Sequence, residues 1–240
     1  MESVGPGRFF VFADPAQYDE YANQLQPLKV NVVSGTHGIR DQRNYILKYF
    51  APDTRIVEVD DDIKGNVCYI SSPKVERWCF MRARPCCQHG KIFYHLWTVA
   101  NERGCSLWGL NPVRNPHLLA WTYTVGLAKS TAQIQGYINF TEGLTLTVPV
   151  MEDYERCFSI YRNKGTCLCA NFFSPITQNR AGGGCKRMCA EAFVEPATLH
   201  QHHQDPRHIV ESRAVNVLKP RYDDVVKAVI PPKKDLRASR

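Results

Sequence analysis

Three consecutive carboxylates, Asp60, Asp61 and Asp62, follow a short apolar segment, and no basic residue separates them. Adjacent negative charges repel one another, so a fold that gathers them without a cation is destabilised. Mg²⁺ and Mn²⁺ prefer oxygen ligands and usually keep phosphate oxygens in their coordination shell. The pattern therefore predicts a divalent ion that bridges the carboxylates of Asp60 and Asp62 to a nucleotide diphosphate. The alternative, common for acidic triplets, is a solvated turn.

A second acidic group, Glu152 and Asp153, stands at the start of a segment with helical spacing that extends to about residue 162. Acidic side chains at a helix start interact favourably with the helix dipole, and this structural role is common. A positioned carboxylate can also take the proton from a hydroxyl that acts as a nucleophile. The catalytic interpretation makes one of these two carboxylates a general base.

Residues 177–187 contain three consecutive glycines together with three cations, Arg180, Lys186 and Arg187. Backbone N–H groups in a glycine-rich loop can surround phosphate oxygens, and the cations add charge-assisted hydrogen bonds. The segment therefore predicts a phosphate-binding loop, and its alternative is a surface linker.

The elements that position Asp60 form a strand, turn, helix and strand unit. Residues 28–33 and 56–59 are apolar strand segments, and residues 39–50 between them have helical spacing. Ligands in open α/β sheets bind at the carboxyl ends of strands. The helix carries Arg43 and Asn44, a cation and an amide that can face the same crevice.

The remaining elements follow from similar signals. Residues 8–13 predict a strand, and helices are predicted over residues 17–25 and 92–103. Two Asn-Pro pairs indicate a rigid loop over residues 107–116, which includes Trp108. Gly136 lies inside a predicted strand and indicates a bulge or the close approach of a ligand. The predicted later strands cover residues 121–128, 132–138, 144–148 and 167–173.

This order of motifs resembles the donor half of a GT-A glycosyltransferase and, more closely, the TET-associated glycosyltransferase family. That family includes enzymes that glycosylate hydroxymethylated pyrimidines in DNA, and a related domain occurs in a eukaryotic growth regulator. The resemblance covers most of residues 8–190 and depends on Gly38, Arg43-Asn44, the Asp60–Asp62 strand end, the Trp108 stretch and Glu152-Asp153.

The resemblance implies an α/β GT-A-like single domain over residues 1–225, with a mixed, mostly parallel central sheet, followed by a basic, disordered tail at 226–240. Residues before Arg8 leave no room for the first strand and helix of such a domain, whose loop holds the nucleoside. This departure leaves a catalytically inactive relative as a further alternative.

The resemblance also implies roles for individual residues. Asp153 matches the general base of an inverting enzyme, and Glu152 is its neighbour. The implied metal ion is Mn²⁺ or Mg²⁺, with Asp60, Asp62 and a late histidine, His208, as ligands. The implied donor is a UDP-sugar, held by Gly38, Arg43, Asn44, Asp60, Asp61, Trp108, Arg180, Lys186 and Arg187.

The charge balance bears on partners and compartment. The net charge is +7, which suits a polyanionic partner such as DNA. The favoured acceptor is therefore a hydroxymethylated base in DNA, and the alternative acceptor is a hydroxyl on a protein. No apolar run is long enough to span a membrane and the first residues lack a signal-peptide pattern. We expect a cytoplasmic, nuclear or viral-factory location and no secretion.

A competing interpretation comes from the cysteines and histidines. Structural zinc would make the chain a non-catalytic, zinc-stabilised nucleic-acid-binding module. Buried thiols and a solvated histidine run are the simpler alternative. The candidate zinc ligands are Cys167, Cys169, Cys185, Cys189, His200, His202 and His203.

Overall fold

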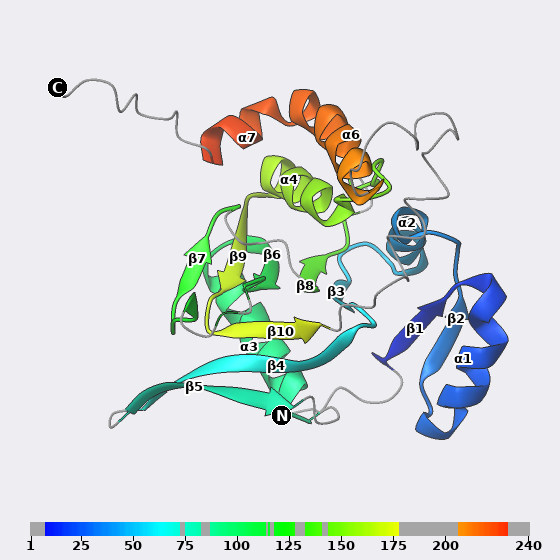
Figure 1. Ribbon diagram of the computed structural model, residues 1–240, viewed down its shortest axis with the longest axis horizontal. Coiled ribbons are helices and arrows are strands. Elements are labelled where there is room, and N and C mark those ends of the chain that lie inside the picture. The colour runs from blue at the N-terminus through cyan, green and yellow to red at the C-terminus, as the bar shows by residue number, and fades with distance from the viewer. Residues whose placement is uncertain are drawn as a thin grey trace.

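The computed structural model describes residues 8–72, 75–82, 87–113, 115, 118–127, 133–140, 144–177 and 206–229. These residues form an α/β structure around a mixed five-stranded sheet (Figure 1). Among them, no helix combines the length and the apolar character that a membrane crossing requires.

The N-terminal part confirms the predicted alternation of strands and helices. β1 and β2 pair in parallel as a separate two-stranded sheet, and α1 connects them. A short 3-10 helix begins after Asp14, whose carboxylate accepts a hydrogen bond from the Ala16 amide at 2.9 Å. The elements in chain order are β1 (Phe10–Ala13), α1 (Tyr18–Leu25), β2 (Asn31–Ser34), α2 (Ile39–Tyr49) and β3 (Arg55–Val59).

The central sheet has the strand order β3-β8-β6-β9-β7. Its further strands are β6 (Cys105–Leu110), β7 (Tyr123–Val125), β8 (Ile134–Ile138) and β9 (Thr166–Ala170). In this sheet β6 and β9 pair in parallel, whereas the other three pairs are antiparallel. The prediction of a mostly parallel sheet is therefore wrong, because β8 and β7 run against their neighbours.

The directions of the strands nevertheless bring three carboxyl ends to one edge of the sheet. β8 lies between β3 and β6 and is antiparallel to both, so β3 and β6 run in the same direction. β9 is parallel to β6. The carboxyl ends of these three strands, at Val59, Leu110 and Ala170, therefore meet at one edge, and Asp60 follows the first of them.

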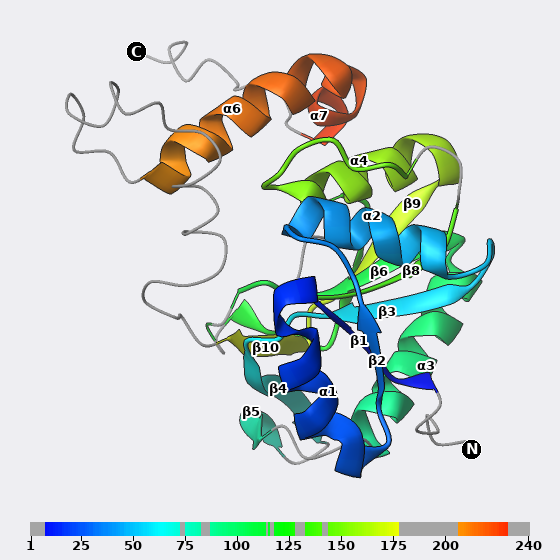
Figure 2. The same cartoon turned by 90° about the vertical axis from the view of Figure 1, so that its right-hand side faces the viewer.

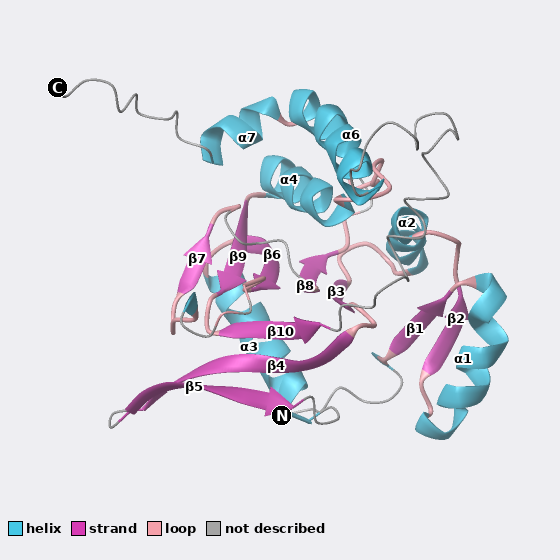
Figure 3. Ribbon diagram, in the orientation of Figure 1, coloured by secondary structure: helices cyan, strands magenta, loops and turns pink. Residues whose placement is uncertain are grey.

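Several local predictions need correction. Residues 107–110 belong to β6, so the predicted loop begins only at Asn111. Residues 144–148 are irregular in structure, and the predicted strand over residues 167–173 is divided between β9 and β10. A third, antiparallel sheet with the order β10-β4-β5 was not foreseen (Figure 3). Its strands are β4 (Ile63–Ser72), β5 (Val75–Arg82) and β10 (Phe173–Thr177).

Helices cover both faces of the central sheet (Figure 2). α3 (Cys87–Glu102) packs on one face, where Leu96 and Ala100 meet Trp108 and Leu168. On the other face α2 and α4 (Glu152–Lys164) pack against Leu107. Leu107 and Trp108 point to opposite faces because side chains alternate along a strand. This alternation along β6 therefore directs Leu107 toward α2 and α4 and Trp108 toward α3.

The C-terminal helices were not predicted from the sequence. α6 (Pro206–Arg221) and α7 (Asp223–Val229) form a third apolar cluster with Val148 and Val150 near α4 (Figure 1). α7 extends into residues 226–229, which were predicted to begin a disordered tail. Residues 230–240 lie outside the described part of the chain.

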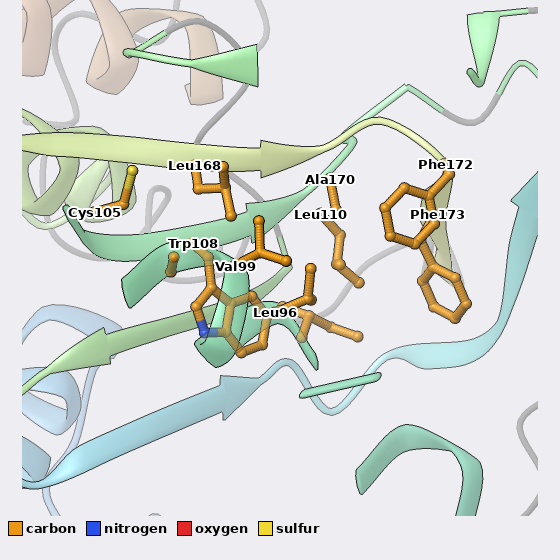
Figure 4. Packing of buried hydrophobic residues seen from close by; sticks show 11 residues of the cluster. Leu96, Val99, Cys105, Trp108, Leu110, Leu168, Ala170, Phe172 and Phe173 are labelled. Atoms are coloured by element: carbon orange, nitrogen blue, oxygen red, sulfur yellow. The ribbon is translucent and has the colours of Figure 1, made fainter. Parts of the chain in front are cut away.

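Trp108 belongs to the core on the α3 face (Figure 4). Its side chain is fully buried, and it lies opposite Gly136 in the pairing of β6 with β8. A Cβ atom at Gly136 would lie 2.1 Å from Cε2 of the indole. The pairing is regular at Gly136, so this glycine makes room for Trp108, and the predicted bulge is absent from these described strands.

We expect Gly136→Ala to lower the free energy of unfolding by about 1–3 kcal/mol or more, because the added methyl group overlaps a buried ring. Urea unfolding measures this loss. In a Trp108→Phe background the same alanine should cost clearly less, since the smaller ring vacates the contact. An equal loss in both backgrounds would show that the indole is not the cause.

Candidate active site

One guanidinium joins the elements that the sequence motifs single out. Nη2 of Arg43, on α2, lies 3.2 Å from Oδ1 of Asp60 at the end of β3. The same nitrogen lies 3.4 Å from Oε1 of Glu152, the first residue of α4. Nη1 lies 3.7 Å from Oε2 of Glu58. Two carboxylates from the segment of β3 and one from the start of α4 therefore surround a single buried cation.

A second buried cation, Arg156 on α4, also pairs with Glu58. Nη1 of Arg156 lies 2.5 Å from Oε2 of Glu58, and its Nη2 lies 3.2 Å from Oε1. The Tyr137 hydroxyl donates to the same Oε1 at 2.6 Å, and the Arg156 guanidinium lies 4.3 Å from the centre of the Tyr137 ring. Neither Glu58 nor Arg156 was predicted as a site residue, although a charged residue between two valines was a visible signal for Glu58.

Glu58 is the ionised anchor of this cluster. Burial alone would raise the pKa of its carboxyl, but Arg156 and then Arg43 reverse that effect and lower the pKa below its usual value. Burial also opposes the charge on Arg43, yet Glu58 and Glu152 raise the pKa of this guanidinium. The pairs that Glu58 forms with Arg156 and with Arg43 are therefore charged in the fold, because each partner compensates the desolvation of the other.

The other carboxylates are less well compensated. Burial, with smaller contributions from Asp62 and Glu152, raises the pKa of Asp60 to about 7, although Arg43 opposes this shift. Burial is also the main reason why the pKa values of Glu152 and Asp153 are raised. Perturbed carboxylates that share a site are typical of places where a ligand or a proton is handled.

The start of α4 has an unusual backbone. Met151 precedes the helix with a φ of 62° and a ψ of 25°, a left-handed conformation that residues other than glycine rarely adopt. This turn directs the chain into Glu152 and Asp153. The Tyr154 amide hydrogen-bonds the Asp153 carboxylate and partly offsets the raised pKa of that group. Such local strain is often found at functional sites.

The chemistry of these side chains fits a divalent ion that binds together with a phosphate. Asp60 is 35% exposed, and its carboxyl lies near other carboxylates. A bound cation would reduce the repulsion between these negative charges. In the described part of the chain, no three His, Cys, Asp or Glu side chains gather as a metal site. Mg²⁺ sites with one or two carboxylates complete their shell with water and substrate phosphates, so such a triad is not required.

The remaining predicted site residues lie as follows. Gly38 directly precedes α2 as its N-cap and has a φ of 86°, which suits a glycine. Asn44 donates to the Leu146 carbonyl at 2.9 Å and accepts from its amide at 2.8 Å, so its amide group fixes a loop next to the cluster. Asp61 follows Asp60 in an exposed turn, and Trp108 lies in the core.

Four of the predicted site residues have no described side chain. His208 lies on α6, but its side chain is outside the described residues, so its role as a metal ligand stays a prediction. The phosphate-binding loop with Arg180, Lys186 and Arg187 also lies outside the described part of the chain.

Glu155 connects this site to the C-terminal helices. Its buried carboxylate accepts hydrogen bonds from the Thr147 and Val148 amides at 2.6 and 3.1 Å. Arg221 at the end of α6 donates to it at 2.8 Å. Since Glu155 lies one turn after Glu152, α6 helps to hold the start of α4 in place.

Four cysteines pack in the core. Cys105, Cys157, Cys167 and Cys169 are buried thiols. The Cys167 thiol donates to the Cys157 carbonyl at 3.9 Å, and the Cys169 thiol to Oδ1 of Asn171 at 3.7 Å. Cys185, Cys189 and the histidines of residues 200–203 are outside the described part of the chain, so the zinc interpretation remains a prediction.

The pKa of Asp60 predicts a pH-dependent stability. A carboxyl with a pKa raised from 3.8 to about 7 favours the fold at low pH, and this contribution is lost as the pH rises through 7. Asp60→Asn should remove that loss. As the pH rises from 3.8 to about 7, the free energy of unfolding of the variant should therefore increase relative to that of the wild type. Water screens part of the effect, because the side chain is 35% exposed.

Urea unfolding in EDTA across this pH interval measures the difference. Asp61→Asn is the matched control, since its side chain is exposed, and it should follow the wild-type profile. Parallel profiles for Asp60→Asn and the wild type would contradict the expectation.

The comparisons with protein-family models, curated proteins and solved structures gave no match to this chain. The resemblance to glycosyltransferases therefore depends on the motifs named above.

Proposed function

We propose that this chain is a metal-dependent glycosyltransferase with a GT-A-like fold, which transfers a sugar from a nucleotide sugar to a hydroxyl. The observation that carries the proposal is the meeting of Asp60 and Glu152 on Nη2 of Arg43. It supports the proposal because the strand end expected to hold metal and donor then lies beside the helix expected to hold the base.

The divalent ion would be held by Asp60 and Asp62, and it would stabilise negative charge on the leaving diphosphate. The acceptor hydroxyl attacks the anomeric carbon and forms the new glycosidic bond, while the bond from that carbon to the diphosphate oxygen breaks. Asp153 takes the hydroxyl proton, and the electron pair of the broken bond leaves with the nucleotide diphosphate.

The surroundings of Asp153 support its role as the base. Burial raises the pKa of its carboxyl above the usual value, and a base with a higher pKa holds the transferred proton better. Glu152 is less suited, because it contacts Arg43 at 3.4 Å. Glu152 would instead position Arg43 beside the donor.

For the acceptor, we favour a hydroxymethylated base in DNA over a hydroxyl on a protein. The net charge of +7 supports this choice, since cationic side chains release counterions from DNA and give a binding that weakens with salt. The base would leave the helical stack to reach Asp153. Transfer of label from a UDP-sugar to duplex DNA with hydroxymethylated pyrimidines tests this choice, and label found only on protein would reverse it.

The activity itself is tested by the release of UDP from UDP-sugars in the presence of Mn²⁺. We expect release by the wild type and its loss on addition of EDTA. Asp62→Asn should abolish Mn²⁺-dependent binding of the nucleotide sugar in calorimetry and leave the circular dichroism spectrum unchanged. Tightly bound zinc without any binding of sugar nucleotides would instead favour the non-catalytic nucleic-acid-binding module.

A further inference from the structure

Arg43 already pairs with the carboxylate that would bind a divalent ion at Asp60. Its Nη2 atom is 3.2 Å from Oδ1 of Asp60, and its side chain is only 10% exposed. A guanidinium keeps its charge at every accessible pH. Cation and guanidinium would therefore compete for one carboxylate and would repel each other across it.

The two buried arginines are held differently. Arg156 binds Glu58 with both terminal nitrogens, at 2.5 and 3.2 Å, and stacks on a tyrosine ring. Arg43 instead touches three carboxylates with single contacts of 3.2, 3.4 and 3.7 Å. A bidentate pair is the stronger arrangement, so Arg43 is the cation that can exchange its partners.

We propose that Arg43 is the resident counter-ion of this carboxylate cluster, and that it keeps a divalent ion away from Asp60 until a diphosphate is present. This inference rests on the proposed function, because it concerns the same site. Diphosphate oxygens can accept hydrogen bonds from the guanidinium and ligate the ion at the same time. Metal and diphosphate then bind together, and each binds weakly alone.

The test uses Mn²⁺ alone, titrated calorimetrically into the full chain. Arg43→Gln should bind Mn²⁺ more tightly than the wild type, by roughly 5- to 150-fold, which is the usual range of coupling between two ligands. Arg43→Lys should show a smaller gain, because an ammonium lacks the planar fork that reaches Asp60 and Glu152 together. Arg40→Gln is the matched control on the same helix, where Arg40 pairs with Asp41, and it should bind Mn²⁺ as the wild type does.

Wild-type affinity in both Arg43 variants would overturn the inference. If Arg43→Gln does not fold by circular dichroism, Arg43→Lys decides the outcome by the sign of its change. The readout does not depend on turnover. If the Arg43 variants show the expected change in Mn²⁺ affinity but the chain releases no UDP, the counter-ion inference stands and the glycosyltransferase proposal is overturned. If the chain releases UDP but the Arg43 variants bind Mn²⁺ as the wild type does, the glycosyltransferase proposal stands and the counter-ion inference is overturned.

Discussion

Asp153→Asn is expected to lower kcat by a hundredfold or more, since a positioned general base contributes about 10²–10⁴-fold to such a reaction. An amide has nearly the same shape as the carboxylate but cannot accept the hydroxyl proton. In the described part of the chain, the ion pairs of Arg43 join it to Glu58, Asp60 and Glu152 and not to Asp153. Donor affinity should therefore hardly change.

Turnover of a labelled UDP-sugar at saturating donor gives kcat, and calorimetry gives the donor affinity. Glu152→Gln is the matched control at the adjacent position. It should weaken donor binding through Arg43 and should reduce kcat less than Asp153→Asn does. If Asp153→Asn lost donor binding but kept its turnover at saturation, the assignment of the base would be wrong.

The meeting of Arg43, Asp60 and Glu152 shows what local patterns can predict. Strand and helix periods located α2, β3 and α4, and the rule that ligands gather at the carboxyl ends of strands directed attention to the edge where Asp60 lies. The carboxyl ends of β3 and β6 meet at this edge although the sheet is mixed, because β8 lies between these two strands of the same direction. The direction of the strands that flank the site mattered more than the parallel character of the whole sheet.

Other features depended on pairings that a single sequence does not reveal. Glu58 and Arg156 are 98 residues apart, and neither has a local motif that points to the other. Asn44 is predicted to hold the donor, and its amide group also binds the backbone of Leu146, 102 residues away, which no local pattern indicates. The polar composition of residues 206–229 concealed α6 and α7, whose few apolar residues suffice to pack on Val148 and Val150. Tertiary contacts override local preference in each case.

Glu58→Gln should have the largest effect on stability, a loss of about 3–5 kcal/mol in the free energy of unfolding. The substitution leaves Arg156, which is fully buried, without its bidentate carboxylate. It also removes a partner of Arg43. An uncompensated buried charge is far more costly than a missing surface pair. Asp224→Asn, which breaks the exposed pair with Arg162, is the control and should change stability much less.

The pH dependence of the same variant distinguishes a lost charge from a lost shape. The pKa of Glu58 is lowered in the fold from its usual 4.5, so its contribution is present above pH 4.5 and disappears as the pH falls through the lowered folded value. The wild type and Glu58→Gln should therefore approach each other in stability on acidification. Combining Glu58→Gln with Arg156→Met should recover part of the loss at neutral pH, because the unpaired charge is gone. A deficit that stayed constant with pH and was not relieved by Arg156→Met would mean that Glu58 acts through its packing and not through its charge.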